Sequence, residues 1–296
     1  MRKLQWMISL IIILSGLVAA ANIGIIQIIE IKEQGFDAKY TYQNAQGDMS
    51  TLQAIAGKLV ADKVDLILAI ATPSAQAAAK ATTTIPVLIT AVTDPVAAGL
   101  VKSLQNPGTN VTGTSDLNPV DKQLALIKQL RPSATRIGII YNAGETNSIV
   151  QVDLAKEAAT KLGLKLVLAT VTETSGVYQA AQSLAGRVDA VYVPTDNTVV
   201  AALESVIAFC ERNRLPLIAG EGESVNRGAV ATIGIDYYQL GRQTGAMALK
   251  ILKGEKPENS PVEFQNTMNL IINTNAAKRM GVTIPQVLMK NATIVQ

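Results

Sequence analysis

The chain repeats one pattern of alternating strands and helices, and this duplication constrains its fold more than any other feature. The run Ile23–Ile26 (Ile-Gly-Ile-Ile) returns as Ile137–Ile140. Three further matches follow in the same order: Lys63–Asp65 with Arg187–Asp189, Ile85–Ile89 with Leu215–Ile218, and, more loosely, Gly108–Gly113 with Gly228–Gly234. Short, continuously apolar runs of this kind are typical of strands buried on both faces of a parallel sheet. The sequence therefore predicts the α/β class, with two similar doubly wound parallel-sheet lobes and a cleft between them.

The two copies differ between their first and second strands. The second copy has room there for a full crossover helix, whereas the first has only residues 30–38. A parallel crossover needs about ten to twelve residues including its helix. We therefore expect the first lobe to lack its first helix.

The first residues predict an export signal. Arg2 and Lys3 precede an apolar run, Leu10–Ala21, that ends in small residues, which is the order of a cleavable signal peptide. No charged residue lies between Lys3 and Glu30, so the same segment could span a bilayer if it were kept. Polar residues within it favour cleavage, so we expect a signal over residues 1–21 and a periplasmic or otherwise extracytoplasmic protein.

Composition argues against several classes of function. The 296 residues carry 26 basic and 23 acidic side chains, and without Arg2 and Lys3 the protein is nearly neutral, which gives no electrostatic case for nucleic acid. There is no histidine, and Cys210 is the single cysteine. The commonest general base and metal ligand are thus missing, and an internal disulfide is excluded. We expect no catalytic residues, no metal and no cofactor.

Small polar residues follow two consecutive predicted strands in the first half. The strand Leu66–Ala71 is followed by Thr72, a candidate helix N-cap, and Val87–Ala91 is followed by Thr93 and Asp94. Open α/β sheets bind ligands at the carboxyl ends of their strands, and a helix start offers N–H groups to an anion. The alternative for Thr72 is that it only caps its helix.

Five runs resemble the substrate-binding proteins of ABC transporters with the type I periplasmic-binding fold, and among these the branch associated with tryptophan and tyrosine uptake. They are Asn44–Asp48, Ala71–Gln76, Thr90–Pro95, Val193–Asn197 and Gly234–Gly241. The resemblance covers nearly all of residues 22–285. It implies two lobes joined by three crossing strands, a small ligand between them, and delivery to a membrane permease. The lobes would comprise residues 22–115 with 237–262, and residues 116–236 with 263–296.

An amino-acid ligand needs donors for its carboxylate and an acid for its ammonium group. Thr72 and Ser74 suit the carboxylate. Asp94, Asp196 and Asp236 are candidates for the ammonium, with a turn as the alternative for Asp94 and a helix cap as the alternative for the other two.

Further candidates come from the second half, where Tyr141 could stack on an aromatic ligand. Glu221 and Glu223 follow a strand end and could line the rim of the cleft, with a solvated loop as the alternative. The complete predicted ligand-binding set is Thr72, Ser74, Ala75, Thr93, Asp94, Tyr141, Asn142, Ser148, Asp196, Asn197, Glu223 and Asp236.

The mechanism expected from these features is capture of a small ligand by hinge closure of a monomeric protein. Two other interpretations remain open. A shortened, non-binding homologue could act only as a partner protein. A ligand-sensing domain of a regulator would share the fold, but it would need a DNA-binding head where the export signal stands.

Overall fold

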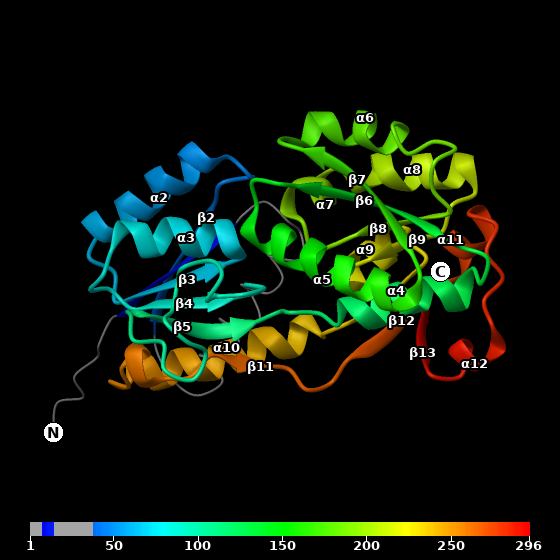
Figure 1. The fold of residues 1–296 in the computed structure, drawn as a ribbon. Helices are drawn as coiled ribbons and strands as arrows, with labels where there is room; N and C mark the ends of the chain where they lie inside the picture. The colour runs from blue at the N-terminus through cyan, green and yellow to red at the C-terminus, as the bar shows by residue number, and fades with distance from the viewer. Residues whose placement is uncertain (1–7, 15–37) are drawn as a thin grey trace, which may run out of the picture. The chain divides into compact units, whose positions relative to one another are not determined.

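The computed structural model describes residues 8–14 and 38–296 (Figure 1). The chain divides into two compact units, which we call the first unit (Met1–Leu117 with Tyr237–Asn266) and the second unit (Asn118–Asp236 with Thr267–Gln296). The chain passes between them three times. Each unit is a sheet with helices packed on it, so the predicted α/β class is confirmed.

The first unit contains a six-stranded sheet with the order β11-β5-β4-β3-β1-β2 among the described residues. Every pairing between its strands is parallel. Its strands are β1 (Ile8–Leu14), β2 (Ala38–Asn44), β3 (Leu66–Ile70), β4 (Val87–Thr90), β5 (Val111–Ser115) and β11 (Glu263–Phe264). Its helices are α2 (Met49–Ala61), α3 (Thr72–Ala81), α10 (Tyr237–Leu252) and the short η2 (Pro257–Asn259).

Strand β1 differs from the expectation. Ile8–Leu14, which lies within the predicted export signal, pairs with both β2 and β3, whereas the run 23–29, predicted as the first strand, lies outside the described residues. The interval from Leu14 to Ala38 is long enough for a parallel crossover, and residues 30–38 alone are not. An isoleucine-rich run suits both a strand and a signal. The signal and the missing first helix both fall wholly or partly on residues that are not described and stay predictions.

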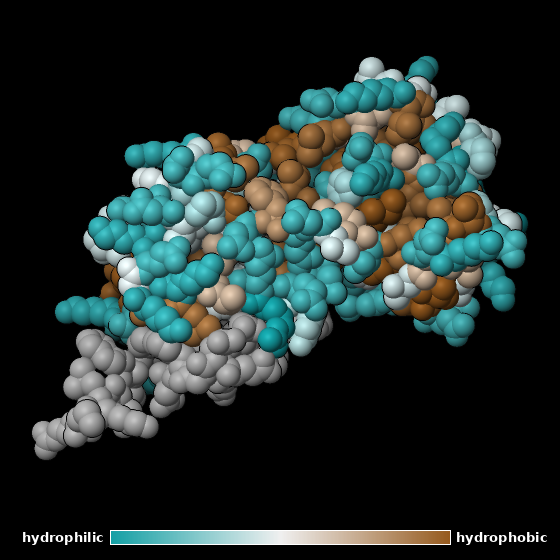
Figure 2. All heavy atoms as spheres, turned by 90° about the horizontal axis from the view of Figure 1, so that it is seen from below, coloured by the Kyte–Doolittle hydropathy of each residue, from teal (hydrophilic) through white to brown (hydrophobic). Residues whose placement is uncertain are grey.

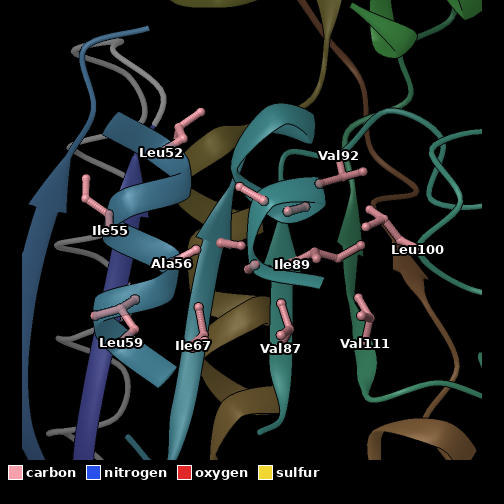
Figure 3. Close-up of a cluster of buried hydrophobic side chains, with 14 of the residues drawn as sticks. Leu52, Ile55, Ala56, Leu59, Ile67, Val87, Ile89, Val92, Leu100 and Val111 are labelled. Carbon is pink, nitrogen blue, oxygen red and sulfur yellow. The ribbon is translucent and has the colours of Figure 1, made fainter. Parts of the chain in front are cut away.

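The core of the first unit explains why β3 and β4 read as continuous apolar runs. On one face, Ile67, Val87 and Ile89 pack against α2 and α3 (Figure 3). On the other, Leu68 and Leu88 pack against α10. Because successive side chains of a strand point to opposite faces, a strand covered on both faces has no position that faces solvent. On α2 the buried residues recur at helical spacing: Leu52, Ile55, Ala56 and Leu59.

The second unit contains a seven-stranded sheet with the order β13-β12-β10-β9-β8-β6-β7, parallel except for the antiparallel pair β10–β12. Its strands are β6 (Arg136–Asn142), β7 (Lys165–Val171), β8 (Ala190–Val193), β9 (Leu217–Ala219), β10 (Ala231–Gly234), β12 (Asn269–Asn273) and β13 (Ala292–Val295). Its helices are α4 (Val120–Leu130), α5 (Thr146–Leu162), α6 (Val177–Gln182), α7 (Asn197–Ala201), α8 (Leu203–Asn213), α9 (Gly222–Arg227), α11 (Thr274–Arg279) and α12 (Gln286–Met289), with a short η1 (Thr174–Gly176).

Hydrophilic residues cover most of the face shown in Figure 2, with hydrophobic residues between them. Within residues 8–14 and 38–296, no helix has both the length and the apolar character needed to cross a bilayer.

Candidate functional site

The start of α3 carries two buried hydroxyl groups with no hydrogen-bond partner. Ala71, not Thr72, is the N-cap, and Thr72 is the first helical residue. Thr72 is 2% exposed and Ser74 is fully buried, and neither Thr72 Oγ1 nor Ser74 Oγ is hydrogen-bonded. The capping alternative for Thr72 is therefore wrong. Buried hydroxyls are normally paired, so these two, beside the N–H groups of a helix start, are suited to an anion such as a carboxylate.

The two polar residues that follow β4, Thr93 and Asp94, form different kinds of hydrogen bond. The hydroxyl of Thr93 donates to Asp116 Oδ1 at 3.1 Å, and the hydroxyl of Tyr237 donates to Asp116 Oδ2 at 2.8 Å. Burial raises the pKa of Asp116. Asp94 instead accepts the N–H groups of the two residues after Pro95, at 2.9 Å each, which is the turn alternative. Asp116 was missed, although its place directly after β5 could have indicated it.

Asp196 is the centre of a buried network in the second unit. It is fully buried, and its Oδ1 caps α7 by accepting the N–H of Val199 at 2.8 Å. Its Oδ2 accepts the N–H of Asn142 at 2.5 Å and the hydroxyl of Ser148 at 2.6 Å. Burial, followed by the charge of Glu145, raises the pKa of Asp196 to about 7. Three predicted residues thus come together, but they bond to each other.

Glu145 is a second buried carboxylate in this network, and its position before a helix was the only signal that could have indicated it. Its Oε1 accepts the N–H and the hydroxyl of Thr198, at 3.0 and 2.8 Å. Its Oε2 accepts the N–H and the amide of Asn197, at 3.0 and 2.6 Å, and the amide of Asn147 at 3.0 Å. Asn197 therefore uses these donors to hold Glu145.

Asn147 and Gln151, one turn apart on α5, hold the loop after β8. The amide of Gln151 donates to the Thr195 hydroxyl at 2.6 Å, and its oxygen accepts the Thr195 N–H at 3.1 Å. Asn147 Nδ2 donates to the Thr195 carbonyl at 2.9 Å. Asn147 Oδ1, in contrast, is buried and has no partner.

Of the two acidic candidates after β9, the structure buries Glu221, whereas Glu223, the one in the predicted ligand-binding set, is less buried. Glu221 is 7% exposed, and it accepts the N–H groups of Glu223 and Ser224, at 2.5 and 2.8 Å, and the Ser224 hydroxyl. Burial raises the pKa of Glu221. Glu223 is half-buried and accepts the amide of Asn226 at 3.0 Å.

The remaining predicted residues are less informative. Ala75 is buried and contributes only its backbone N–H, which bonds to the Ala71 carbonyl at 3.1 Å. Tyr141 and Asp236 are half-buried. Across the described ranges, no group of histidine, cysteine, aspartate or glutamate residues could hold a metal ion, and Cys210 is buried with its pKa raised mainly by that burial.

The family model of the ABC transporter substrate binding proteins matches residues 10–296. This chain belongs to that family. Its members are extracytoplasmic binding proteins of transport systems and not enzymes, as the sequence predicted.

Individual relatives agree with the family and the fold. The chain is 47% identical over 262 residues to a tyrosine-binding protein of Clostridioides difficile (strain R20291), covering 88% of this chain and 76% of the relative. A Streptococcus pneumonia structure in complex with L-Trp matches with a TM-score of 0.95 and 35% identity, over 98% of this chain and all (100%) of that chain. A ligand-free, open structure of an adhesive substrate binding protein from Clostridium difficile matches with a TM-score of 0.73 and 44% identity, over 97% and 99% of the two chains. The predicted type I periplasmic-binding fold is thereby confirmed.

Proposed function

We propose that this protein captures an aromatic amino acid, tryptophan or tyrosine, outside the cytoplasm for an ABC importer. The relatives named for tyrosine and solved with L-Trp support this ligand class. The chain shares more than a third of its residues with each of them, and the likeness extends over most of its length.

The observation that carries the proposal is the pair of unpartnered hydroxyls on Thr72 and Ser74. Both are buried at the start of a ten-residue helix, whose free N–H groups and dipole favour a negative charge. The ligand carboxylate supplies the acceptors that these groups lack. Thr72 and Ser74 thus keep the role that the sequence suggested for them.

The second unit supplies the opposite charge. Glu145 is buried, and among the described residues it forms no ion pair. Buried carboxylates that only neutral groups compensate make their surroundings favourable to a cation. The ligand's ammonium group would bind on this side.

Capture would proceed by closure of the two units around the ligand, with the three passages of the chain acting as the hinge, followed by delivery to the permease. Closure needs a ligand that binds the closed state better than the open one. A ligand with contacts to both units meets this condition, whereas one held by a single unit does not.

Isothermal titration with tryptophan, tyrosine, phenylalanine and leucine tests the proposal. We expect heat with an aromatic amino acid and roughly tenfold weaker binding in Thr72→Val, which removes one donor and keeps the side-chain shape. Thr83→Val, at an exposed position next to the same helix, should bind as the wild type does. Silence of the wild type towards all four ligands would instead indicate a non-binding homologue.

A further inference from the structure

Three of the predicted ligand-binding residues of the second unit, Asn142, Ser148 and Asn197, use the donors described above within one network. Asn142 and Ser148 donate to Asp196, and Asn197 donates to Glu145. Asp196 accepts three hydrogen bonds and Glu145 accepts five. Their contacts are those expected of groups that hold the loops after β6 and β8 together.

One acceptor in this network is left over. Asn147 is 3% exposed, and its Nδ2 donates to Glu145 Oε2 at 3.0 Å and to the Thr195 carbonyl at 2.9 Å, with a longer contact of 3.4 Å to Ser148 Oγ. Its Oδ1 has no donor. A buried amide oxygen without a donor is costly, so this atom is suited to a ligand that supplies a donor.

The orientation of the Asn147 amide is fixed by its neighbours. Rotation by half a turn would place Oδ1 against Glu145 Oε2 and the Thr195 carbonyl, which are both acceptors. That arrangement is repulsive. The free atom is therefore an oxygen, and a ligand that satisfies it has to present an N–H or O–H group.

The charge around Asn147 selects the kind of donor. Its amide is bonded to the carboxylate of Glu145, and Ser148, the next residue, is bonded to that of Asp196. The described residues place no lysine or arginine in an ion pair with either carboxylate. A cationic donor gains from this field and a neutral one does not.

We propose that the side-chain oxygen of Asn147 is the hydrogen-bond acceptor for the ammonium group of the bound amino acid, with the Glu145 carboxylate, which is bonded to the amide of the same side chain, supplying the negative field around it. This assignment rests on the proposed function, and it adds a specificity-determining residue beyond the predicted ligand-binding set. It requires that the protein distinguish an α-amino acid from the same molecule without its amino group.

The test compares two proteins, each with two kinds of ligand. Affinities of the wild type and of Asn147→Leu are measured by titration for tryptophan and tyrosine and for their deamino analogues, in which hydrogen replaces the amino group. The wild type should prefer the amino acid by roughly ten- to a hundredfold, the range for a hydrogen bond to a charged group. In Asn147→Leu that preference should be lost, because the amino acid binds more weakly while the analogue changes by less than about twofold.

Two controls separate recognition from damage to the fold. Asn291→Leu changes an exposed asparagine of the second unit and should leave both affinities unchanged. Asn147→Ser is a smaller change and should also lose the preference for the amino acid over its deamino analogue. Thermal melting of both variants, measured in parallel, shows whether a folding defect of the leucine variant explains its loss of binding.

The outcomes are distinct. Equal weakening of both ligands in the Asn147 variants, or an unchanged preference, would show that Asn147 only positions the loops and would overturn the assignment. A wild type that binds the amino acid and its analogue equally would overturn it as well, and the proposed function would stand. A wild type silent towards tryptophan and tyrosine would overturn the proposed function and this inference together.

Discussion

At the scale of single residues, the backbone is strained directly before the candidate ligand-binding residues that follow β3 and β4. Ala71, the N-cap of α3, has φ 71° and ψ 157°, and Ala91, directly after β4, has φ 53°. Conformations with positive φ are costly for residues that carry a side chain, and they cluster at binding sites. The strain lies in the short turn through which the chain leaves β3 and starts α3, so it belongs to the geometry that buries Thr72 and Ser74.

Relief of this strain should stabilise the protein. Glycine has no Cβ atom, so the positive φ at position 71 is not strained in Ala71→Gly. We expect the free energy of unfolding of this variant to rise by about 1 kcal/mol, although glycine also gives the unfolded chain more conformational entropy. Urea denaturation measures the change. Ala79→Gly, in the last turn of the same helix, is the control and should lose about 1 kcal/mol. Loss of stability in both variants would contradict the strain.

Removal of the unpartnered hydroxyls should change the stability of the protein and its affinity for ligand in opposite directions. Thr72→Val and Ser74→Ala each remove a buried oxygen that has no hydrogen-bond partner. We therefore expect each variant, measured without ligand, to be more stable by about 1 kcal/mol, while ligand affinity falls. Thermal melting with and without ligand measures both effects, and Thr83→Val should change neither. A fall in stability without ligand would show that these hydroxyls are structural.

At the scale of elements, buried polar groups fix how helices dock on the sheets. In the first unit the fully buried hydroxyls of Thr90, Thr114 and Thr244 bond to one another at 2.7–3.1 Å, which ties α10 to β4 and β5. In the second unit Gln123 on α4 donates to the carbonyls of Gly220 and Ile233 and accepts the Tyr192 hydroxyl at 2.7 Å. Such bonds are directional and apolar contacts are not, so they set the position of each helix.

Removal of one member of the threonine group should be costly. Thr244→Val keeps the shape and leaves the hydroxyls of Thr90 and Thr114 with fewer partners, so we expect a loss of about 1–3 kcal/mol in the free energy of unfolding. The matched control is Thr160→Val, an exposed helical position. Thr160 bonds the carbonyl four residues earlier, as Thr244 does, at 2.9 and 2.8 Å respectively. Equal losses in the two variants would show that the buried group adds nothing.

At the scale of the whole molecule, buried acids in both units should make stability depend on pH. Burial raises the pKa of Asp116 in the first unit and of Glu221 in the second, and burial together with Glu145 raises that of Asp196 to about 7. A raised pKa means that the folded protein holds a proton that the unfolded chain has released. The stability from that proton is complete below pH 4 and is lost as the pH rises through the folded pKa.

We therefore expect the free energy of unfolding to fall between pH 5 and pH 8, with Asp196 contributing about 1–3 kcal/mol. Urea denaturation at intervals across this range measures the slope, and no histidine contributes because the chain has none. Asp196→Asn should flatten the profile, whereas Asp153→Asn, at an exposed ion pair with Lys156, should not. A wild-type slope that survives in Asp196→Asn would contradict this assignment.

Some of this protein was determined by its sequence alone. The repeated apolar runs predicted the α/β class, and the strands Leu66–Ile70, Val87–Thr90 and Arg136–Asn142 follow them closely. Gly163 ends α5 in the left-handed conformation that glycine adopts most readily. Burial on both faces of a sheet and helix termination are local requirements, so a short stretch of chain expresses them.

Other features were decided only by the tertiary structure. Ser148 bonds to Asp196 across 48 residues, and Asp116 meets Tyr237 across 121, so neither contact has a local pattern. The apolar run Ile8–Leu14 fits a strand and an export signal equally well, and only its pairing with β2 and β3 made it β1. The register of separate elements decides which polar groups of the candidate site keep a free hydrogen-bonding atom. A linear sequence does not specify that register by itself.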